Sequence, residues 1–227
     1  MIKFYYHPSP NPAKVALLLE ETGLPYELVP VDTRKGEQHS PAFRAINPNA
    51  KTPAIVDGDE AIFDSNAILL YLAEKTGKFL PDGHRGDLLS WLMFVATGIG
   101  PYCGQAVHFK HFAPGPNVYA VNRYDFEAWR HWNLIEERLA KQRYMVGDTY
   151  TIADMAVWGW ARVIPRVLGD GAWEKLPNVR RLFDEINARP AAQRAEALAK
   201  RHAFKTEVDD EARRILFPQN ARLAAGA

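Results

Sequence analysis

The chain has 227 residues, 47% of them hydrophobic, which is enough for one large core or two modest ones. Its 28 Lys and Arg residues nearly balance 27 Asp and Glu residues, so no strong field would attract nucleic acid or an anionic membrane surface. No stretch approaches the ~18 apolar residues of a membrane span, and no signal segment is apparent. We therefore expect a cytoplasmic protein whose partner is a small molecule, with no role for nucleic acid or membrane.

The first 80 residues alternate short apolar runs with helical patterns, which is typical of a small α/β unit with parallel strand pairing. The predicted elements in chain order are a strand at 2–6, a helix from about 12 to 22, a strand at 26–31, a short helix at 41–46, and a hairpin of 54–56 with 61–63. A further helix should begin at Ser65 and end at Gly77. The predicted order is β-α-β-α-β-β-α.

Residues 79–83 have linker composition, and no convincing period-two alternation follows them. We therefore predict an α/β domain over 1–80 and an all-helical domain over 87–227. Thr151 to Asp154 form a capping-box pattern that leads into the apolar run 155–163, the predicted central helix of the second domain. From about residue 205 we expect a partly mobile tail, which ends in the alanine-rich residues 224–227.

The single cysteine, Cys103, excludes an intramolecular disulfide and a Cys-x-x-Cys redox pair. A lone cysteine of this kind is more often a small buried hydrophobe than a reactive thiol, and we assign it no role. His108 and His111 are spaced i, i+3, but without a third ligand nearby they do not indicate a metal site. Any thiol chemistry must therefore use a thiol from another molecule, and we expect no metal.

Ser9 and Asn11 lie in a proline-rich loop that leads from the first strand into the first helix. A thiol placed near that helix N-terminus would lose its proton more readily, and the Ser9 hydroxyl or the Asn11 amide could donate to the thiolate. The alternative is that both residues merely cap the helix, and the local sequence gives the two alternatives even weight.

Thr52 and Pro53 stand just before the third strand, where a proline removes a donor from the ladder. If their bond is cis, the Thr52 N–H and C=O face outward as an edge on which an extended peptide can pair. The alternative is an ordinary trans proline, since only about 5% of X–Pro bonds are cis.

Asp64 and Ser65 open the long helix, whose free amides and Ser65 hydroxyl suit a carboxylate, while Asp64 could pair with an ammonium group. A plain N-cap is the alternative. A ligand with an α-amino acid at one end, a peptide backbone in the middle and a thiol at the other end would satisfy all three features together. Glutathione is such a ligand.

The sequence resembles the glutathione transferase family over nearly its full length. The resemblance is carried by the Ser9-Pro10-Asn11 loop, residues 47–57, residues 63–72 and the Thr151 to Asp154 capping box. The loop, together with residues 35–38 (Lys-Gly-Glu-Gln), resembles the bacterial nu class, whose members are similar to fungal nitrogen-regulator proteins. The resemblance implies a thioredoxin-like first domain, a helical second domain, a homodimer, and glutathione as co-substrate.

Carried over residue by residue, the resemblance implies a glutathione site with distinct regions. The catalytic residues near the sulfur would be Ser9 and Asn11, and the cysteinyl part would pair with the main chain of Thr52, just before Pro53. The remaining assignments are Asp64 and Ser65 for the γ-glutamyl end, Gln38 and Lys51 for the glycyl carboxylate or nearby backbone, and Arg130 near the site. Arg130 could instead be an ordinary exposed helix residue.

This chain departs from the usual nu class pattern in having Ser9 in place of threonine and Asp64 in place of glutamate. Both exchanges keep the functional group. Other classes activate the thiol with a tyrosine at the end of the first strand, but Tyr5 and Tyr6 alternate within that strand, so one of them should pack into the core. A glutaredoxin-like or omega-like mechanism would need a cysteine near Ser9, and there is none.

Five aromatic residues could form a wall between the domains for the apolar body of an electrophile; core packing or a dimer contact would explain them equally well. They are His108, Phe109, Phe112, Trp129 and Trp132. The resemblance favours a detoxifying enzyme in which glutathione reduces a small disulfide, or is transferred to a small electrophile, without a protein cysteine. The alternatives are a non-catalytic ligand-binding or protein-interaction module, and dehalogenase or isomerase activity on the same scaffold.

Overall fold

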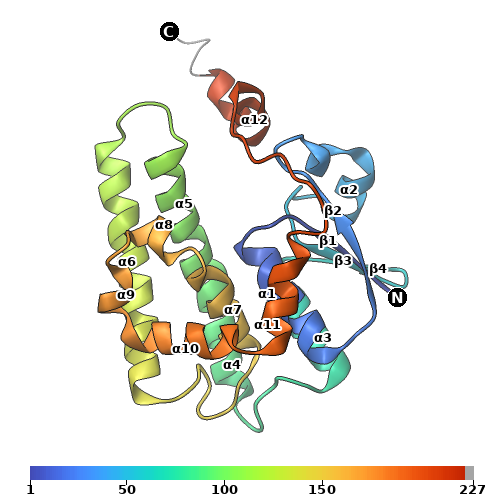
Figure 1. Ribbon diagram of the computed structural model, residues 1–227, viewed down its shortest axis with the longest axis vertical. Coiled ribbons are helices and arrows are strands. Elements are labelled where there is room, and N and C mark those ends of the chain that lie inside the picture. The colour runs from blue at the N-terminus through green and yellow to red at the C-terminus, as the bar shows by residue number, and fades with distance from the viewer. Residues whose placement is uncertain (223–227) are drawn as a thin grey trace.

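The computed structural model describes residues 1–222. A four-stranded sheet forms the centre of the amino-terminal part, in the order β2-β1-β3-β4 (Figure 1). Its strands are β1 (Ile2–Tyr6), β2 (Tyr26–Pro30), β3 (Ala54–Asp57) and β4 (Glu60–Phe63). β1 pairs in parallel with β2 but antiparallel with β3, and β3 and β4 are antiparallel. The predicted hairpin of β3 and β4 is confirmed, and the predicted parallel pairing is right for β1 and β2, whereas β1 and β3 are antiparallel.

Three helices belong to this sheet: α1 (Pro10–Thr22), α2 (Pro41–Ile46) and α3 (Ser65–Thr76). α1 begins two residues earlier than predicted because a proline fits the first turn of a helix, where its missing N–H has no partner to lose. Both long helices end at a left-handed glycine, Gly23 with φ 72° and Gly77 with φ 64°, as the sequence predicts.

The two tyrosines of β1 lie on opposite faces of the sheet. Tyr6 shares the main core with Phe4 and the buried residues of α1, and its hydroxyl donates to the Leu198 carbonyl over 3.0 Å. Tyr5 packs against Phe43 of α2 in a second, smaller cluster. The prediction that one tyrosine packs into the core is confirmed, and neither residue lines the cavities described below.

The rest of the described chain is helical, apart from an isolated bridge between Val146 and Thr149. Its helices are α4 (Arg85–Phe94), α5 (Gly100–His111), α6 (Val118–Lys141), α7 (Ile152–Ala161), α8 (Ile164–Leu168), α9 (Ala172–Lys175), α10 (Pro177–Asn187), α11 (Pro190–Leu198) and α12 (Asp210–Leu216). The predicted class, an α/β part followed by an all-helical part, is confirmed. None of these helices is long and apolar enough to cross a bilayer.

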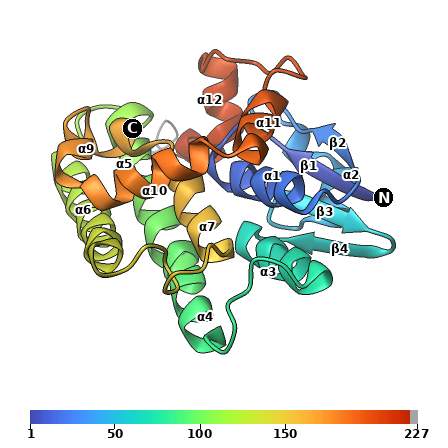
Figure 2. The same ribbon diagram turned by 60° about the horizontal axis from the view of Figure 1, so that its bottom comes forward.

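α7 is the central helix of the second part, as predicted, and all ten of its residues are buried. Figure 2 shows it between the helical bundle and the helices of the sheet. Its first turn carries the predicted capping box: the Asp154 carboxylate accepts from the Thr151 amide over 2.8 Å and from the Met145 amide over 2.7 Å. One continuous apolar core runs through both parts of the chain, so α7 joins them.

The segment predicted to be a partly mobile tail instead follows a defined path back to the sheet. The Lys205 amide donates to Asp32 Oδ2 over 2.7 Å, and Arg34 donates to the Lys205 carbonyl over 2.6 Å. α12 then begins with Asp209, whose carboxylate accepts from the Ala212 amide. The segment is visible in Figure 1 as the red chain that crosses above the sheet. Residues 224–227 lie outside the described part of the chain.

A buried lysine lies where α1, α3 and α4 meet. Lys14 is 1% exposed, and its Nζ donates to Asn66 Oδ1 over 2.5 Å, while Asn66 donates to the Leu92 carbonyl. Burial lowers the pKa of Lys14 from 10.5 to about 7, and the more distant charge of Asp64 opposes this shift. The ammonium form is thus less stable in the folded chain than in the unfolded chain.

This shift predicts a pH-dependent contribution to stability. Between pH 7 and 10 the unfolded chain binds a proton at Lys14 that the folded chain releases, so the free energy of unfolding should rise with pH, by up to about 1.4 kcal/mol per unit. Urea denaturation of the wild type and Lys14→Met across this range would measure the difference, with the exposed Lys78→Met as control. Parallel curves for wild type and Lys14→Met would contradict the assignment.

Candidate functional site

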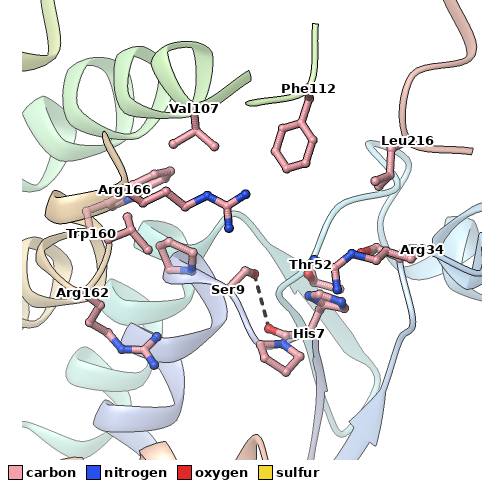
Figure 3. A pocket seen from close by; sticks show the side chains of 15 residues that line it. His7, Ser9, Arg34, Thr52, Val107, Phe112, Trp160, Arg162, Arg166 and Leu216 are labelled. Atoms are coloured by element: carbon pink, nitrogen blue, oxygen red, sulfur yellow. Dashed lines mark hydrogen bonds between the residues drawn. The ribbon is translucent and has the colours of Figure 1, made fainter. Parts of the chain in front are cut away.

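The loop between β1 and α1 carries the first predicted site residues. Ser9 occupies the N-cap position with extended backbone, but its side chain does not cap the helix. Its hydroxyl instead makes a long contact of 3.3 Å with the His7 carbonyl (Figure 3). The capping alternative therefore fails for Ser9, and its hydroxyl is available to a ligand at the positive end of α1.

Asn11 is held by the helical part of the protein. Its Oδ1 accepts a hydrogen bond of 3.0 Å from Trp160 Nε1 on α7. This contact fixes which way the amide points and leaves the Asn11 NH₂ group as the donor that remains for a ligand. Asn11 is half-buried and does not line either cavity described next, so it would reach a ligand from the edge.

Two cavities meet beside this loop. The interdomain cavity, of about 470 Å³, lies between the loop and helices α5, α7 and α8, and Figure 3 shows its side chains. The loop cavity, of about 420 Å³, is lined by residues of the 33–39 and 49–52 loops and by the end of the chain around α12. Four residues line both cavities: Ser9, Thr33, Thr52 and Leu216. Ser9 and Thr52, predicted from separate motifs, therefore lie at the junction.

The Thr52–Pro53 bond is cis, one of the two alternatives left open by the sequence. Thr52 lies outside the ladders of β3 and takes part in none of the other main-chain hydrogen bonds among residues 1–222. Its N–H and C=O are thus available at the junction of the two cavities.

The loop cavity contains two further predicted residues, Gln38 and Lys51. Gln38 is 5% exposed, and its Nε2 donates to the Thr33 carbonyl over 3.0 Å. Its Oε1 is buried without a hydrogen-bond partner among the described residues. A buried acceptor left unpaired costs free energy, so this oxygen is a candidate to receive a ligand N–H.

Comparison with known proteins supports the resemblance in the sequence. Family profiles described as the glutathione S-transferase N-terminal and C-terminal domains match residues 1–74 and 129–190. Over 204 residues, 86% of this chain and 94% of its relative, the sequence is 42% identical to the disulfide-bond oxidoreductase YfcG of Escherichia coli. The chain belongs to the glutathione S-transferase family.

Solved structures of the family agree with this assignment. A family member from Pseudomonas fluorescens with two glutathione molecules bound has a TM-score of 0.81 and 38% identity, covering 86% of this chain and 91% of that one. A glutathione transferase from Pseudomonas putida with one glutathione disulfide bound per subunit has a TM-score of 0.79 and 34% identity, covering 86% and 90%. The α/β part is therefore the thioredoxin-like domain of this family.

Asp64 and Ser65 lie at the start of α3 and line neither cavity. Asp64 has a left-handed backbone, with φ 68°, and its carboxylate caps the helix by accepting from the amides of Asn66 and Ala67 over 2.8 and 3.3 Å. The N-cap alternative is thus confirmed for Asp64. Because the carboxylate is also exposed, it remains accessible to an ammonium group.

Arg130 is a further predicted residue that lies outside the two cavities. It lies on α6, where its Nε donates to Glu127 over 2.8 Å and its NH2 lies 3.2 Å from the His131 ring. The alternative, an exposed helix residue, describes it within one protomer, and its ion pair with Glu127 is local to α6.

The aromatic wall predicted from the sequence is wrong for four of its five members, and only Phe112 lines the interdomain cavity. Phe109 stacks on Tyr124, and Trp132 is fully buried and donates to Cys103 Sγ over 3.3 Å. Phe109 and Trp132 thus pack between α5 and α6, whereas His108 packs against Phe217 after α12 and Trp129 lies against Lys175 of α9. Burial raises the pKa of the Cys103 thiol to about 12, which leaves it inert.

Sequence analysis missed several residues that line the interdomain cavity. Trp160 was assigned only to the central helix, and His7, Arg34 and Arg166 were not considered. His7 Nε2 is buried without a partner among the described residues, and burial, followed by the charge of Arg34, lowers the pKa of this ring. The signals were weak because His7 and Arg34 reach the cavity from loops, Arg166 from the five-residue α8, and Trp160 from a helix whose other residues form the core. In residues 1–222 no group of His, Cys, Asp and Glu is arranged to hold a metal ion.

Gly159 allows α7 to approach the site loop closely. A Cβ atom at this position would lie 2.8 Å from the Pro10 carbonyl and 3.1 Å from Lys14 Cβ. Gly159→Ala should therefore push α1 and α7 apart and lower the free energy of unfolding by about 1–3 kcal/mol, as measured by urea denaturation.

The matched control is Gly86→Ala on α4, where a Cβ meets nothing within 4 Å. Because alanine favours a helix over glycine, this variant should be as stable as the wild type or more stable by up to about 1 kcal/mol. Equal free energies of unfolding for the two variants would show that α1 and α7 accommodate the added methyl group without loss of stability.

Proposed function

We propose that this protein uses glutathione to reduce small disulfides, and to attack small electrophiles, without a cysteine of its own. The observation that carries the proposal is the junction of the two cavities at Ser9 and Thr52. One cavity suits the carboxyl-terminal half of glutathione and the other suits a second substrate, so a thiol at the junction would face its target. The named activity of YfcG and the glutathione disulfide bound in the Pseudomonas putida relative support the same chemistry.

In this proposal glutathione lies along the edge of the α/β domain. Its γ-glutamyl end would lie by Asp64 and Ser65 at the N-terminus of α3, where an ammonium can pair with the exposed carboxylate. The cysteinyl main chain would pair with Thr52. The glycyl part would enter the loop cavity, where Gln38 Oε1 can accept its N–H and Lys51 can pair with its carboxylate.

The thiol is activated by donors rather than by a base. The Ser9 hydroxyl, the Asn11 NH₂ group and the N-terminus of the 13-residue α1 all stabilise negative charge, so they would lower the pKa of a thiol placed among them. A bound thiolate would then be the dominant form near neutral pH.

The disulfide reaction proceeds through two exchanges. The glutathione thiolate attacks one sulfur of the disulfide, the S–S bond breaks, and the first product leaves as a thiolate that takes a proton. A second glutathione thiolate then attacks the mixed disulfide, which releases the second product and forms glutathione disulfide. Two glutathione molecules are oxidised for each disulfide reduced, and Cys103, being fully buried, takes no part.

The homodimer implied by the resemblance is also part of the proposal. Several large apolar side chains are exposed on one protomer, among them Phe63 at 42% and Met93 at 44%. Large apolar and aromatic side chains of this kind are enriched in the buried centres of interfaces between subunits.

A parallel assay tests the activity. Turnover of 2-hydroxyethyl disulfide and of an aryl halide would be measured with and without glutathione, with the uncatalysed rate subtracted. We expect glutathione-dependent turnover of the disulfide at a higher kcat/KM than that of the halide. Retention on immobilised glutathione without turnover of either compound would favour the non-catalytic binding module and would sink the enzymatic proposal.

Asn11→Ala should separate activation from binding. Loss of a hydrogen bond to a thiolate should cost roughly 1.5–3 kcal/mol, so kcat should fall about 10-fold or more while the Kd for glutathione changes less. The pKa of bound glutathione, followed by thiolate absorbance, should rise. Trp160→Phe, which keeps the amide but removes the donor that orients it, should show a smaller change of the same kind. Unchanged turnover in Asn11→Ala would reject this role.

A further inference from the structure

The charged residues that line the interdomain cavity all have the same sign. Its lining contains three arginines, Arg34, Arg162 and Arg166, and no aspartate or glutamate. The chain as a whole is nearly neutral. This concentration of positive charge is therefore a property of the cavity rather than of the protein surface in general.

The three arginines differ in whether their charge is already neutralised. Arg162 donates through both Nε and NH2 to the Glu196 carboxylate, over 2.6 and 2.8 Å, so it is paired. Arg166 has no carboxylate partner among residues 1–222; its guanidinium carbon lies 5.4 Å from the centre of the Phe112 ring. Within the described part of the chain, the Arg34 side chain bonds only a carbonyl oxygen, that of Lys205.

Arg166 and Arg34 approach the cavity from opposite walls. Figure 3 shows Arg166 extending from α8 toward Ser9, and Arg34 extending from the other side toward Thr52 and His7. The positive charge of Arg34 also acts on the His7 ring, whose pKa is lowered first by burial and then by this charge. The remaining walls are largely apolar, including Val107, Phe112 and Trp160.

Neither carboxylate of the bound glutathione is expected to pair with Arg166. In the arrangement proposed above, one lies by the N-terminus of α3 and the other lies in the loop cavity near Lys51. Arg166 lines only the interdomain cavity, across from Ser9. Its guanidinium is therefore left for the molecule that the thiolate attacks.

We propose that the interdomain cavity selects second substrates that carry a carboxylate, and that Arg166 determines this specificity. The inference rests on the proposed function, since it assigns the second substrate of that reaction. A guanidinium binds a carboxylate through two parallel hydrogen bonds, and the ring of Phe112 beneath it limits how far it can move. The substrate class is a disulfide or electrophile with a small apolar body and a carboxylate a few bonds from the reacting atom.

Two disulfides that differ mainly in this group provide the test. Dithiodiglycolate carries a carboxylate where 2-hydroxyethyl disulfide carries a hydroxymethyl group. For each, kcat/KM is divided by the rate constant of the uncatalysed reaction with glutathione, which removes the difference in intrinsic reactivity. The ratio of the two normalised values, acid over alcohol, should exceed one in the wild type. It should fall about 3- to 5-fold in Arg166→Gln, because an ion pair made by an exposed side chain contributes no more than about 1 kcal/mol.

Three further measurements sharpen the result. Arg166→Lys should lose part of the preference, because an ammonium keeps the charge without the two-pronged geometry. Raising the ionic strength should lower the wild-type ratio. The matched control is Arg180→Gln, an exposed arginine on α10 that pairs with Asp184 and lies outside the cavity, and it should leave the ratio unchanged.

An equal fall for both disulfides in Arg166→Gln would mean that Arg166 acts on the glutathione thiolate, and would overturn the specificity assignment while leaving the proposed function intact. A wild-type ratio of one or below would also overturn it. If neither disulfide is turned over, the proposed function fails, and calorimetry decides the inference. Tighter binding of dithiodiglycolate than of the neutral disulfide, lost in Arg166→Gln, would support it, and equal binding would refute it.

Discussion

The contact between α7 and the first turn of α1 is the constraint on which the site depends. Gly159 lets the two helices approach so closely that a Cβ atom at this position would lie 2.8 Å from the Pro10 carbonyl oxygen. Trp160, the next residue, orients the Asn11 amide through a hydrogen bond. α7 itself is held by its buried capping box at Asp154. The helical part thus does more than cover the α/β domain, because it orients the Asn11 amide in the first turn of α1, where we propose that the thiol binds.

The division of the candidate site into an interdomain cavity and a loop cavity follows from the same arrangement. The site loop lies where three structural units converge: the sheet with its helices, the helical bundle and the returning carboxyl-terminal segment. Ser9 and Thr52 are shared by both cavities because the loop before α1 and the turn before β3 end at the same edge of the sheet. A ligand along this edge must therefore present its middle to the junction and its two ends to different chemical surroundings.

Much of this could be predicted from the sequence, since local patterns determine it. The glycine stops of α1 and α3, the short helix at Pro41–Ile46 and the capping box at Thr151 all depend on residues near in the chain, and they were predicted to within two residues. The motif resemblance named Ser9, Thr52, Gln38 and Lys51, and all four line the loop cavity. The direction of β3 relative to β1 and the packing of α5 against α6 depend on distant contacts. The sequence therefore did not predict the antiparallel β1–β3 pair, and it left core packing and a cavity wall as equal alternatives for the aromatic residues.

The carboxyl-terminal segment is the part of the fold that the sequence predicts least well, because its polar composition is typical of a tail. The residues that hold it in place, Asp32 and Arg34, lie about 170 positions earlier in the chain. Leu216 forms part of the wall of both cavities. During synthesis, the α/β domain leaves the ribosome long before this segment does. A nascent chain can therefore fold its sheet early, yet its pocket stays unfinished until this segment has also emerged and α12 is free to dock.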